Sequence, residues 1–267
     1  MTDRSFIDQL ADTWGHLSSL CHELGEQEWH APTECPGWDV RDQVAHVVGT
    51  EAFLLGRSLP PPASPAAHVR NALGESNEAW AEHWRHRPIA ELVAELDEVT
   101  AARLGALRAM TDEELDRPGW SPVGEAPYAT FMAIRVMDCW VHEQDIRQAT
   151  GRPWRFDSPA APCALDRLLS AIGFVVGKRV APPEGTVVTL AVLGAVPREV
   201  TVVVRGGRAV PAGGAAAGTR VAMAGEAFVR LAAGRLDPDK ALEEGLVHLD
   251  GDLSVGRALV ANLAHLP

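Results

Sequence analysis

Apolar residues recur at every third or fourth position along much of the first 150 residues, the spacing that places them on one face of an α-helix. This period is clear in residues 4–25, in the stretch that begins at Asp39, in 89–110 and in 131–147, and a more polar helix is predicted for 68–86. Loops that contain proline and glycine separate these segments. Four long helices joined by loops predict a four-helix bundle for this part of the chain.

The second helix carries a sequence signal for its own beginning. Asp39 and Asp42 stand three residues apart, as in a capping box, and Trp38 precedes them as an apolar residue that can pack against the first turns. The apolar pattern continues past His46 and ends before the prolines of 60–62. We therefore predict a helix that opens at Asp39.

The pattern changes after the segment 151–162, which is rich in proline. A helix is predicted over 164–180, and β-branched runs bounded by glycine or proline predict strands. The strands are 186–192, 199–204, 219–225 and 247–249, and further helices are predicted at 226–233, 238–244 and 253–263. This mixture predicts an α+β domain with a small, mostly antiparallel sheet. A chain of 267 residues is long enough for two domains, and we assign 1–152 to the helical bundle and 160–267 to the α+β domain.

Composition and charge narrow the choice of partners. The chain has 46% hydrophobic and 22% charged residues, an ordinary globular mix, and a formal net charge of −12. An acidic chain lacks the basic face that nucleic acid requires, so we expect no nucleic-acid partner. No apolar run approaches the roughly 18–20 residues that span a bilayer, and the N-terminus lacks the apolar core of a signal peptide, so we expect no membrane partner. Four scattered cysteines without a C-x-x-C pair are typical of reduced thiols in a cytoplasmic protein.

The segment 131–147 concentrates the candidate chemistry of the chain. As a helix it places on one face, at spacings of three and four residues, Arg135, Asp138, His142 and Asp145. Because large apolar residues surround them, these ionisable groups are costly to bury unless they are paired or bind a ligand. An acid and a histidine on consecutive turns are also how one helix offers two ligands to a divalent metal.

A third ligand is available on the second helix. His46 lies about two turns from its start, and inward-facing side chains of neighbouring helices build metal sites in such bundles. We therefore predict His46, Asp138 and His142 as the ligands of one divalent metal. Two histidines and one carboxylate leave open positions, as a catalytic metal requires. The alternative for His46 is a hydrogen-bonded histidine of the core.

These residues belong to two longer motifs. They are Glu34-Cys-Pro-Gly-Trp-Asp-Val-Arg-Asp-Gln-Val-Ala-His46 and Arg135-Val-Met-Asp-Cys-Trp-Val-His-Glu-Gln-Asp-Ile-Arg147. Together they resemble the mycothiol-dependent maleylpyruvate isomerase family, and 228–238 with 245–252 are similar to its C-terminal domain. The resemblance spans nearly the whole chain. It implies a multidomain fold, with an N-terminal all-α, DinB-like four-helix bundle and a C-terminal α+β, sterol-carrier-like domain.

The resemblance also implies roles for individual residues. In that family a histidine from the second helix and an acid-x-x-x-His pair from the fourth bind one divalent metal, usually zinc, and His46, Asp138 and His142 match those positions. The acid here is Asp where the characterised isomerase has Glu, so the carboxylate is one methylene shorter. Arg135 and Asp145 are then predicted as catalytic groups that orient the ligands or the substrate. Their alternative is a salt-bridge network on the surface. No residues are assigned to mycothiol binding.

A reaction follows from such a site. A divalent metal favours the thiolate form of a bound thiol and polarises a carbonyl group. Thiolate addition to an activated double bond, bond rotation and elimination convert cis to trans, whereas a reaction that stops after addition is an S-transfer. We therefore predict an enzyme that uses mycothiol, the thiol implied by the resemblance, to modify or isomerise a small electrophile. Its partners are these two small molecules, and we expect a monomer or a homodimer.

Other interpretations remain open. Cys139, beside Asp138, is a rival nucleophile, although a buried structural cysteine is the simpler interpretation, and Cys35 is a candidate for redox chemistry. The sterol-carrier-like domain leaves open a hydrophobic small-molecule binding protein with a relic metal site. A zinc-dependent hydrolase, with Glu51 as the base that activates water, is a further alternative.

Overall fold

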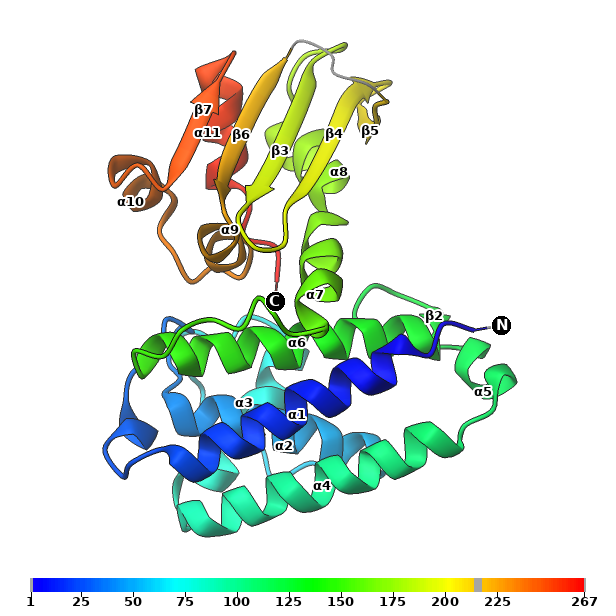
Figure 1. Cartoon of the computed structure of the whole chain (residues 1–267), viewed down its shortest axis with the longest axis vertical. Helices are drawn as coiled ribbons and strands as arrows, with labels where there is room; N and C mark the ends of the chain where they lie inside the picture. The colour runs from blue at the N-terminus through cyan, green and yellow to red at the C-terminus, as the bar shows by residue number, and fades with distance from the viewer. Residues whose placement is uncertain (1, 214–217, 267) are drawn as a thin grey trace. The chain divides into compact units, whose positions relative to one another are not determined.

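The chain divides into two compact units, residues 2–164 and 165–266 (Figure 1). The computed structural model describes residues 2–213 and 218–266. The predicted domain bounds, 1–152 and 160–267, stay a prediction, and their outermost residues 1 and 267 lie outside the described residues.

Helices make up most of the N-terminal unit. They are α1 Ser5–Glu23, the short 3-10 helix η1 Glu28–His30, α2 Val40–Leu54, α3 Ala72–Arg85, α4 Ile89–Ala109, α5 Asp112–Asp116 and α6 Tyr128–Ala149. A two-stranded ribbon, β1 Pro118–Gly119 with β2 Ala126–Pro127, precedes α6. Helices α1 and α2 each pack against both α4 and α6, which closes a four-helix bundle, and α3 lies along α2 (Figure 1). The predicted bundle is therefore confirmed.

The capping box predicted at the start of α2 is present. Asp39 Oδ1 accepts a hydrogen bond from the Asp42 backbone N–H at 3.0 Å, and Asp42 Oδ2 accepts one from the Asp39 backbone N–H at 3.3 Å. Just before this cap the chain turns back on itself, because the Thr33 N–H donates to the Trp38 carbonyl oxygen at 3.2 Å. The turn and the cap together fix Thr33 and Trp38 at the first turns of α2.

Gly49 lets α2 and α3 approach closely, because Trp80 of α3 fills the space where a side chain would begin. A Cβ at Gly49 would lie 2.2 Å from Trp80 Cγ. We therefore expect Gly49→Ala to lower the free energy of unfolding by about 1–3 kcal/mol, measured by urea denaturation. The matched control is Gly105→Ala on the exposed side of α4, where a Cβ meets nothing within 4 Å.

The control should raise the free energy of unfolding by about 0.5–1 kcal/mol, since alanine is the better helix former. A Gly49→Ala protein as stable as Gly105→Ala would contradict the close approach of α2 and α3.

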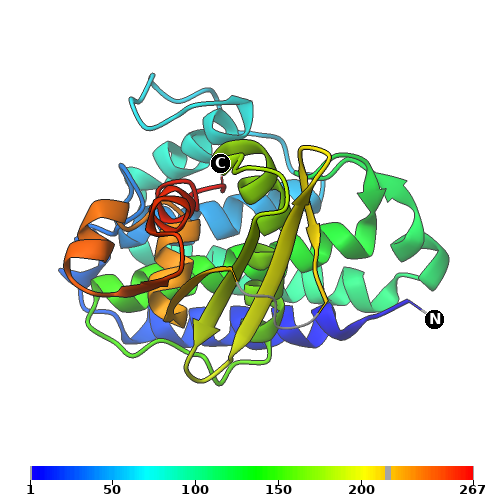
Figure 2. The ribbon, with the colours of Figure 1, turned by 90° about the horizontal axis from the view of Figure 1, so that it is seen from above.

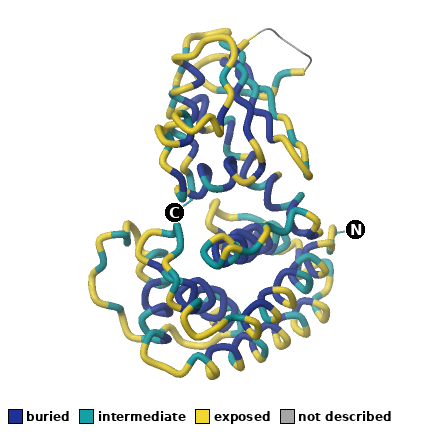
Figure 3. The backbone as a smooth tube through the Cα atoms, turned by 60° about the vertical axis from the view of Figure 1, so that its left-hand side comes forward, coloured by how far each residue is buried: buried dark blue, intermediate teal, exposed yellow. Residues whose placement is uncertain are grey.

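Helix α6 is enclosed along most of its length, and 14 of its 22 residues are buried. The buried residues of the unit gather where the helices face one another (Figure 3). A helix buried on several sides must satisfy its polar groups inside the protein. Glu143 shows this, because its carboxylate is fully buried and accepts hydrogen bonds from Arg147 at 2.8 Å and Arg155 at 3.3 Å.

The C-terminal unit combines a five-stranded sheet with helices. Its elements are α7 Ala160–Leu169 (which begins before the division), α8 Ile172–Phe174, the π-helical η2 Val175–Val180, β3 Val187–Leu193, β4 Arg198–Arg205, β5 Arg208–Pro211, β6 Thr219–Ala224, α9 Gly225–Ala232, α10 Pro238–Glu243, β7 Val247–Asp250 and α11 Leu253–Ala261. The strand order is β5-β4-β3-β6-β7, and only the β3–β6 pair is parallel. The predicted mostly antiparallel sheet is therefore confirmed.

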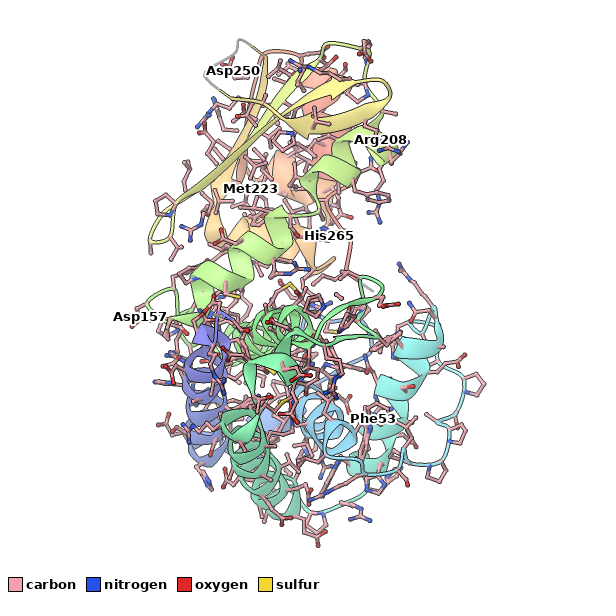
Figure 4. The ribbon with its side chains drawn as sticks, turned by 90° about the vertical axis from the view of Figure 1, so that its right-hand side faces the viewer. Phe53, Asp157, Arg208, Met223, Asp250 and His265 are labelled. Carbon is pink, nitrogen blue, oxygen red and sulfur yellow. The ribbon has the colours of Figure 1, made fainter. Side chains whose placement is uncertain are left out.

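The helices α11 and η2 contact each other and the sheet, and they lie on the same side of it (Figure 2). This layer buries an apolar sheet face, to which Met223 of β6 (Figure 4) belongs. Two details differ from the sequence prediction. The strand β5 was not predicted, because four residues that include an arginine and a proline carry no clear alternation. The helix predicted over 164–180 begins at Ala160 and is divided after Leu169 into α7, α8 and η2.

One helical stretch in the described part of the chain, 160–180, is long and apolar enough by composition to cross a membrane. Its most apolar part is 56% buried inside the protein. The expectation that no apolar run reaches spanning length was therefore wrong. A single half-buried stretch of this kind is weak evidence for a membrane span, since core helices share these properties.

Candidate metal centre

Three potential metal ligands from two helices lie together in the N-terminal unit. Helix α2 supplies His46, α6 supplies Asp138 and His142, and one ligand atom of each lies within 4.8 Å of the other two. His46 Nε2 is 3.0 Å from Asp138 Oδ2, and His142 Nε2 is 3.5 Å from Asp138 Oδ1. Each oxygen of the carboxylate thus faces one of the two imidazoles. The structure brings the three predicted ligands together, and their metal-binding role stays a prediction.

Burial and hydrogen bonding at this cluster fit a divalent cation. The side chains of His46 and His142 are 6% and 8% exposed, whereas that of Asp138 is 27% exposed, so the carboxylate is the solvent-facing member. His46 Nδ1 is buried and has no hydrogen-bond partner among the residues that the structure describes. Two imidazoles and a carboxylate are a donor set that zinc and related ions accept. The residues present therefore fit the predicted metal.

Trp38 packs against both imidazoles. Its ring centroid lies 5.4 Å from that of His46 and 6.0 Å from that of His142, and the two imidazole centroids are 4.6 Å apart. The Trp38 indole N–H donates to Glu78 Oε2 at 2.9 Å, and Arg85 donates to the other oxygen of Glu78 at 2.7 Å. The indole is thereby held in place against the cluster.

A buried chain of charged groups supports Asp138 from the other side. Arg135 donates to Asp138 Oδ2 through Nη1, and its Nε donates to Glu51 Oε1 at 2.9 Å. Arg103 Nε donates to the second oxygen of Glu51, also at 2.9 Å, and its Nη2 donates to the Tyr128 hydroxyl at 2.9 Å. Both arginines and Glu51 are at most 5% exposed. Alternating charges of this kind compensate one another where water is absent.

This network settles two alternatives from the sequence. Arg135 and Asp145 are only 4% and 6% exposed, so they do not form a salt-bridge network on the surface. Glu51, the proposed base of a hydrolase, accepts hydrogen bonds from a guanidinium group on each carboxylate oxygen. Both oxygens of this carboxylate are already bound to guanidinium groups, so Glu51 is not positioned to activate a water molecule. The prediction of Glu51 as the base of a hydrolase was therefore wrong. The predicted catalytic roles of Arg135 and Asp145 stay predictions.

Gln43 is a residue of this cluster that sequence reasoning missed. It is fully buried on α2, and its Oε1 accepts a hydrogen bond from His142 Nδ1. Asp145 approaches the same nitrogen, with Oδ2 at 3.6 Å. The available signal was spacing, because Gln43 stands three residues before His46 and so shares its helix face.

The electrostatics of the cluster favour an anionic carboxylate facing a cation. Burial opposes ionisation of Asp138, but Arg135 and both imidazoles outweigh it and hold the pKa of this carboxyl well below its usual range. Burial lowers the pKa of His46, although Asp138 acts in the opposite direction. Burial also disfavours the charged form of His142, yet Asp138 and Asp145 together raise its pKa. The two carboxylates thus attract positive charge to the His142 side of the cluster.

Cys139 is not a competing nucleophile in this geometry. Burial raises the pKa of its thiol to about 12, even though the nearby Arg135 acts to lower it. The thiol lies in the core, where its sulfur accepts a hydrogen bond from the Trp14 indole N–H at 3.3 Å. Because the thiolate is the reactive form, a thiol with this pKa is inert at neutral pH.

Comparison with known proteins assigns two regions of the chain to known families and finds solved structures with a similar fold. Residues 10–147 match the family described as mycothiol maleylpyruvate isomerase N-terminal domain, and 165–264 match the SCP-2 sterol transfer family. The crystal structure of a histidine-to-alanine mutant of the mycothiol-dependent maleylpyruvate isomerase aligns with 94% of this chain and 96% of its own, at 16% identity and a TM-score of 0.57.

The crystal structure of the same isomerase without that mutation aligns with 88% of this chain and 93% of its own, at 18% identity and a TM-score of 0.55. At such identities the likeness is one of fold. Against the curated proteins the chain has no significant match.

Proposed function

Because the chain belongs to the mycothiol maleylpyruvate isomerase N-terminal domain family, we propose that it is a metal-dependent enzyme that uses mycothiol to isomerise a small electrophile or to transfer the thiol to it. The matches confirm the predicted family and fold class, a DinB-like helical bundle followed by a sterol-carrier-like α+β domain. Isomerisation is the preferred reaction, because the similar solved structures are mycothiol-dependent maleylpyruvate isomerases.

The cluster of His46, Asp138 and His142 carries the proposal. A bound Zn²⁺ or other divalent ion would supply a Lewis acid, and mycothiol would supply a sulfur that adds to an activated double bond and leaves again. The chain itself supplies three ligand side chains and keeps them in place. Arg135 holds one oxygen of Asp138, and Trp38 covers the two imidazoles.

The experiment that tests this function measures thiol dependence. We expect protein loaded with Zn²⁺ to convert maleylpyruvate to its trans isomer, followed by absorbance, only when mycothiol is present. The matched control is mycothiol with a methylated sulfur, which keeps the shape of the thiol but has no nucleophile. It should give no turnover above the protein-free rate.

Other outcomes would replace the proposal with one of its rivals. Turnover without any thiol would indicate a hydrolase or another metal-dependent reaction. A protein that binds neither Zn²⁺ nor mycothiol would leave a small-molecule binding protein with a relic metal site. Consumption of mycothiol in proportion to the electrophile would assign S-transfer in place of isomerisation.

Binding of a small molecule by the C-terminal unit is a second candidate function, and an open surface groove favours it. The groove has a volume of about 370 Å³ and lies between the α7–α8 segment and the strands β4 and β5. Leu169, Val200 and Val202 contribute apolar lining, and Asp166 pairs with Arg198 at 2.6 Å on its border. This lining suits a molecule that is apolar on one side and polar on the other.

A further inference from the structure

Gln43 is the last link in a chain of hydrogen bonds that begins in the turn before α2 and ends on His142. Its side chain has no exposed surface. The amide lies between Thr33 Oγ1, which is 2.8 Å from Gln43 Nε2, and His142 Nδ1. Because each atom in this chain has a fixed capacity to donate or accept, the chain determines which nitrogen of His142 carries the proton.

The direction of the first bond follows from Thr33. Its Oγ1 lies 2.7 Å from the Trp38 carbonyl oxygen. A carbonyl oxygen can only accept, so the Thr33 hydroxyl donates its single proton there. The Cys35 backbone N–H donates to the same Oγ1 at 3.2 Å. With its proton already used, Thr33 can only accept from Gln43, and the NH₂ group of Gln43 must face it.

The orientation of the Gln43 amide then fixes the tautomer of His142. With the NH₂ group on Thr33, the Gln43 carbonyl oxygen faces His142 Nδ1 and can only accept from it. A neutral imidazole carries one N–H, so the proton is on Nδ1 and the lone pair is on Nε2. Nε2 is the nitrogen that lies 3.5 Å from Asp138 Oδ1, on the side of the other two ligands.

One charged group lies beside each ring nitrogen of His142. Asp145, one turn further along α6, places a second acceptor 3.6 Å from Nδ1. Asp138, on the preceding turn, approaches Nε2 instead. Nδ1 therefore has two acceptors, Gln43 on α2 and Asp145 on α6, whereas Nε2 has one, the Asp138 carboxylate, and we assign the proton by the closer contact of Gln43 with Nδ1.

We propose that Thr33 and Gln43 are positioning residues that hold His142 as its Nδ1–H tautomer and so aim the Nε2 lone pair at the metal position. A ligand histidine whose distal N–H is bonded to an acceptor is oriented and made more basic. The consequence for metal binding rests on the proposed function. The tautomer is a property of the metal-free chain and does not depend on that function.

The first test is NMR spectroscopy of the metal-free, full-length protein with isotope-labelled histidine. It is run at alkaline pH, where the imidazoles are neutral, and the His142 signals are assigned by their loss in His142→Gln. Ring-nitrogen shifts should show a protonated Nδ1 and a bare Nε2 in the wild type. A protonated Nε2 in the wild type would overturn the proposal.

A matched pair of variants at Thr33 tests the origin of the tautomer. Thr33→Ser keeps the hydroxyl and should give the wild-type shifts. Thr33→Val keeps the shape but removes the acceptor, so the Gln43 amide can turn its NH₂ group toward His142 and the Nε2–H tautomer should become populated. Identical His142 shifts in Thr33→Val and Thr33→Ser would show that Thr33 does not set the tautomer.

Zn²⁺ affinity, measured by competition with a coloured chelator, tests the consequence. We expect Gln43→Met to weaken binding by about 10–100-fold, Thr33→Val by a smaller factor, and Thr33→Ser not at all. Gln43→Glu restores an acceptor for the Nδ1–H and should recover most of the affinity, even if Gln43→Met folds poorly. Wild-type affinity in a folded Gln43→Met protein would overturn the positioning role. Absence of Zn²⁺ binding in a wild type that shows the expected tautomer would refute the proposed function and leave the tautomer assignment standing.

Discussion

Replacing His142 with alanine is expected to abolish stoichiometric Zn²⁺ binding and to lower mycothiol-dependent turnover by at least about 10²-fold, because the proposed reaction depends on the bound metal. The imidazole is one of three potential ligands, and its Nε2 lies 3.5 Å from the Asp138 carboxylate. Two remaining ligands would bind a divalent ion weakly. The measurement is metal content after exhaustive dialysis, together with kcat/KM.

The matched control for this variant is His86→Ala. His86 is 81% exposed and its only acidic neighbour in the described residues is Glu82, at 3.5 Å. Its replacement should change neither metal content nor turnover. Full Zn²⁺ occupancy in His142→Ala would remove His142 from the ligand set, and equal losses in both variants would point to a general effect on the fold.

Glu51→Gln is expected to lower the free energy of unfolding by about 3–5 kcal/mol, the usual cost of removing one partner from a buried ion pair. Glu51 is 1% exposed, and its carboxylate accepts hydrogen bonds from Arg103 and Arg135, each at 2.9 Å. Without the negative charge, two buried guanidinium groups lose their shared counterion. Urea denaturation monitored by circular dichroism measures the change.

A surface pair supplies the control. Glu98 pairs with Arg57 at 3.0 Å, but its side chain is 71% exposed, so Glu98→Gln should cost less than about 1 kcal/mol. Adding Arg103→Met to Glu51→Gln should recover part of the loss, since one uncompensated charge is removed. Equal free energies of unfolding for Glu51→Gln and Glu98→Gln would show that the buried network does not stabilise the fold more than the surface pair does.

The fold was predictable to the extent that it depends on local pattern. The apolar period of residues 4–25, the paired aspartates at 39 and 42, and the β-branched run of 186–192 each specify their own element, and the structure has α1, the capping box of α2 and β3 at these places. The elements that the sequence pattern did not predict correctly are short strands or interrupted helices. The strand β5 has four residues, and its place is decided by pairing with β4.

The candidate site was predictable where a single helix carries its geometry. The spacing of Asp138 and His142 alone places them on one face of α6. The prediction of a helical bundle then identified His46, on a neighbouring helix, as the third ligand. Gln43 and Glu51 were harder to recognise, because their roles depend on partners on other helices. Gln43 contacts a residue 99 positions away, and Glu51 contacts arginines 52 and 84 positions away. Such pairings are properties of tertiary packing, which residue type and spacing do not reveal.

The sequence distance across the candidate metal centre also has a consequence for folding. His46 and Asp138 are 92 residues apart, so their contact requires closure of a long loop, and such non-local contacts are costly to form early. The pair Asp138 and His142 is the exception, since one helix presents both. During synthesis the three-ligand site can assemble only after α6 has left the ribosome and docked on α2. A metal ion bound by these three residues would therefore act on the finished bundle and slow its unfolding, and would not guide the first folding steps.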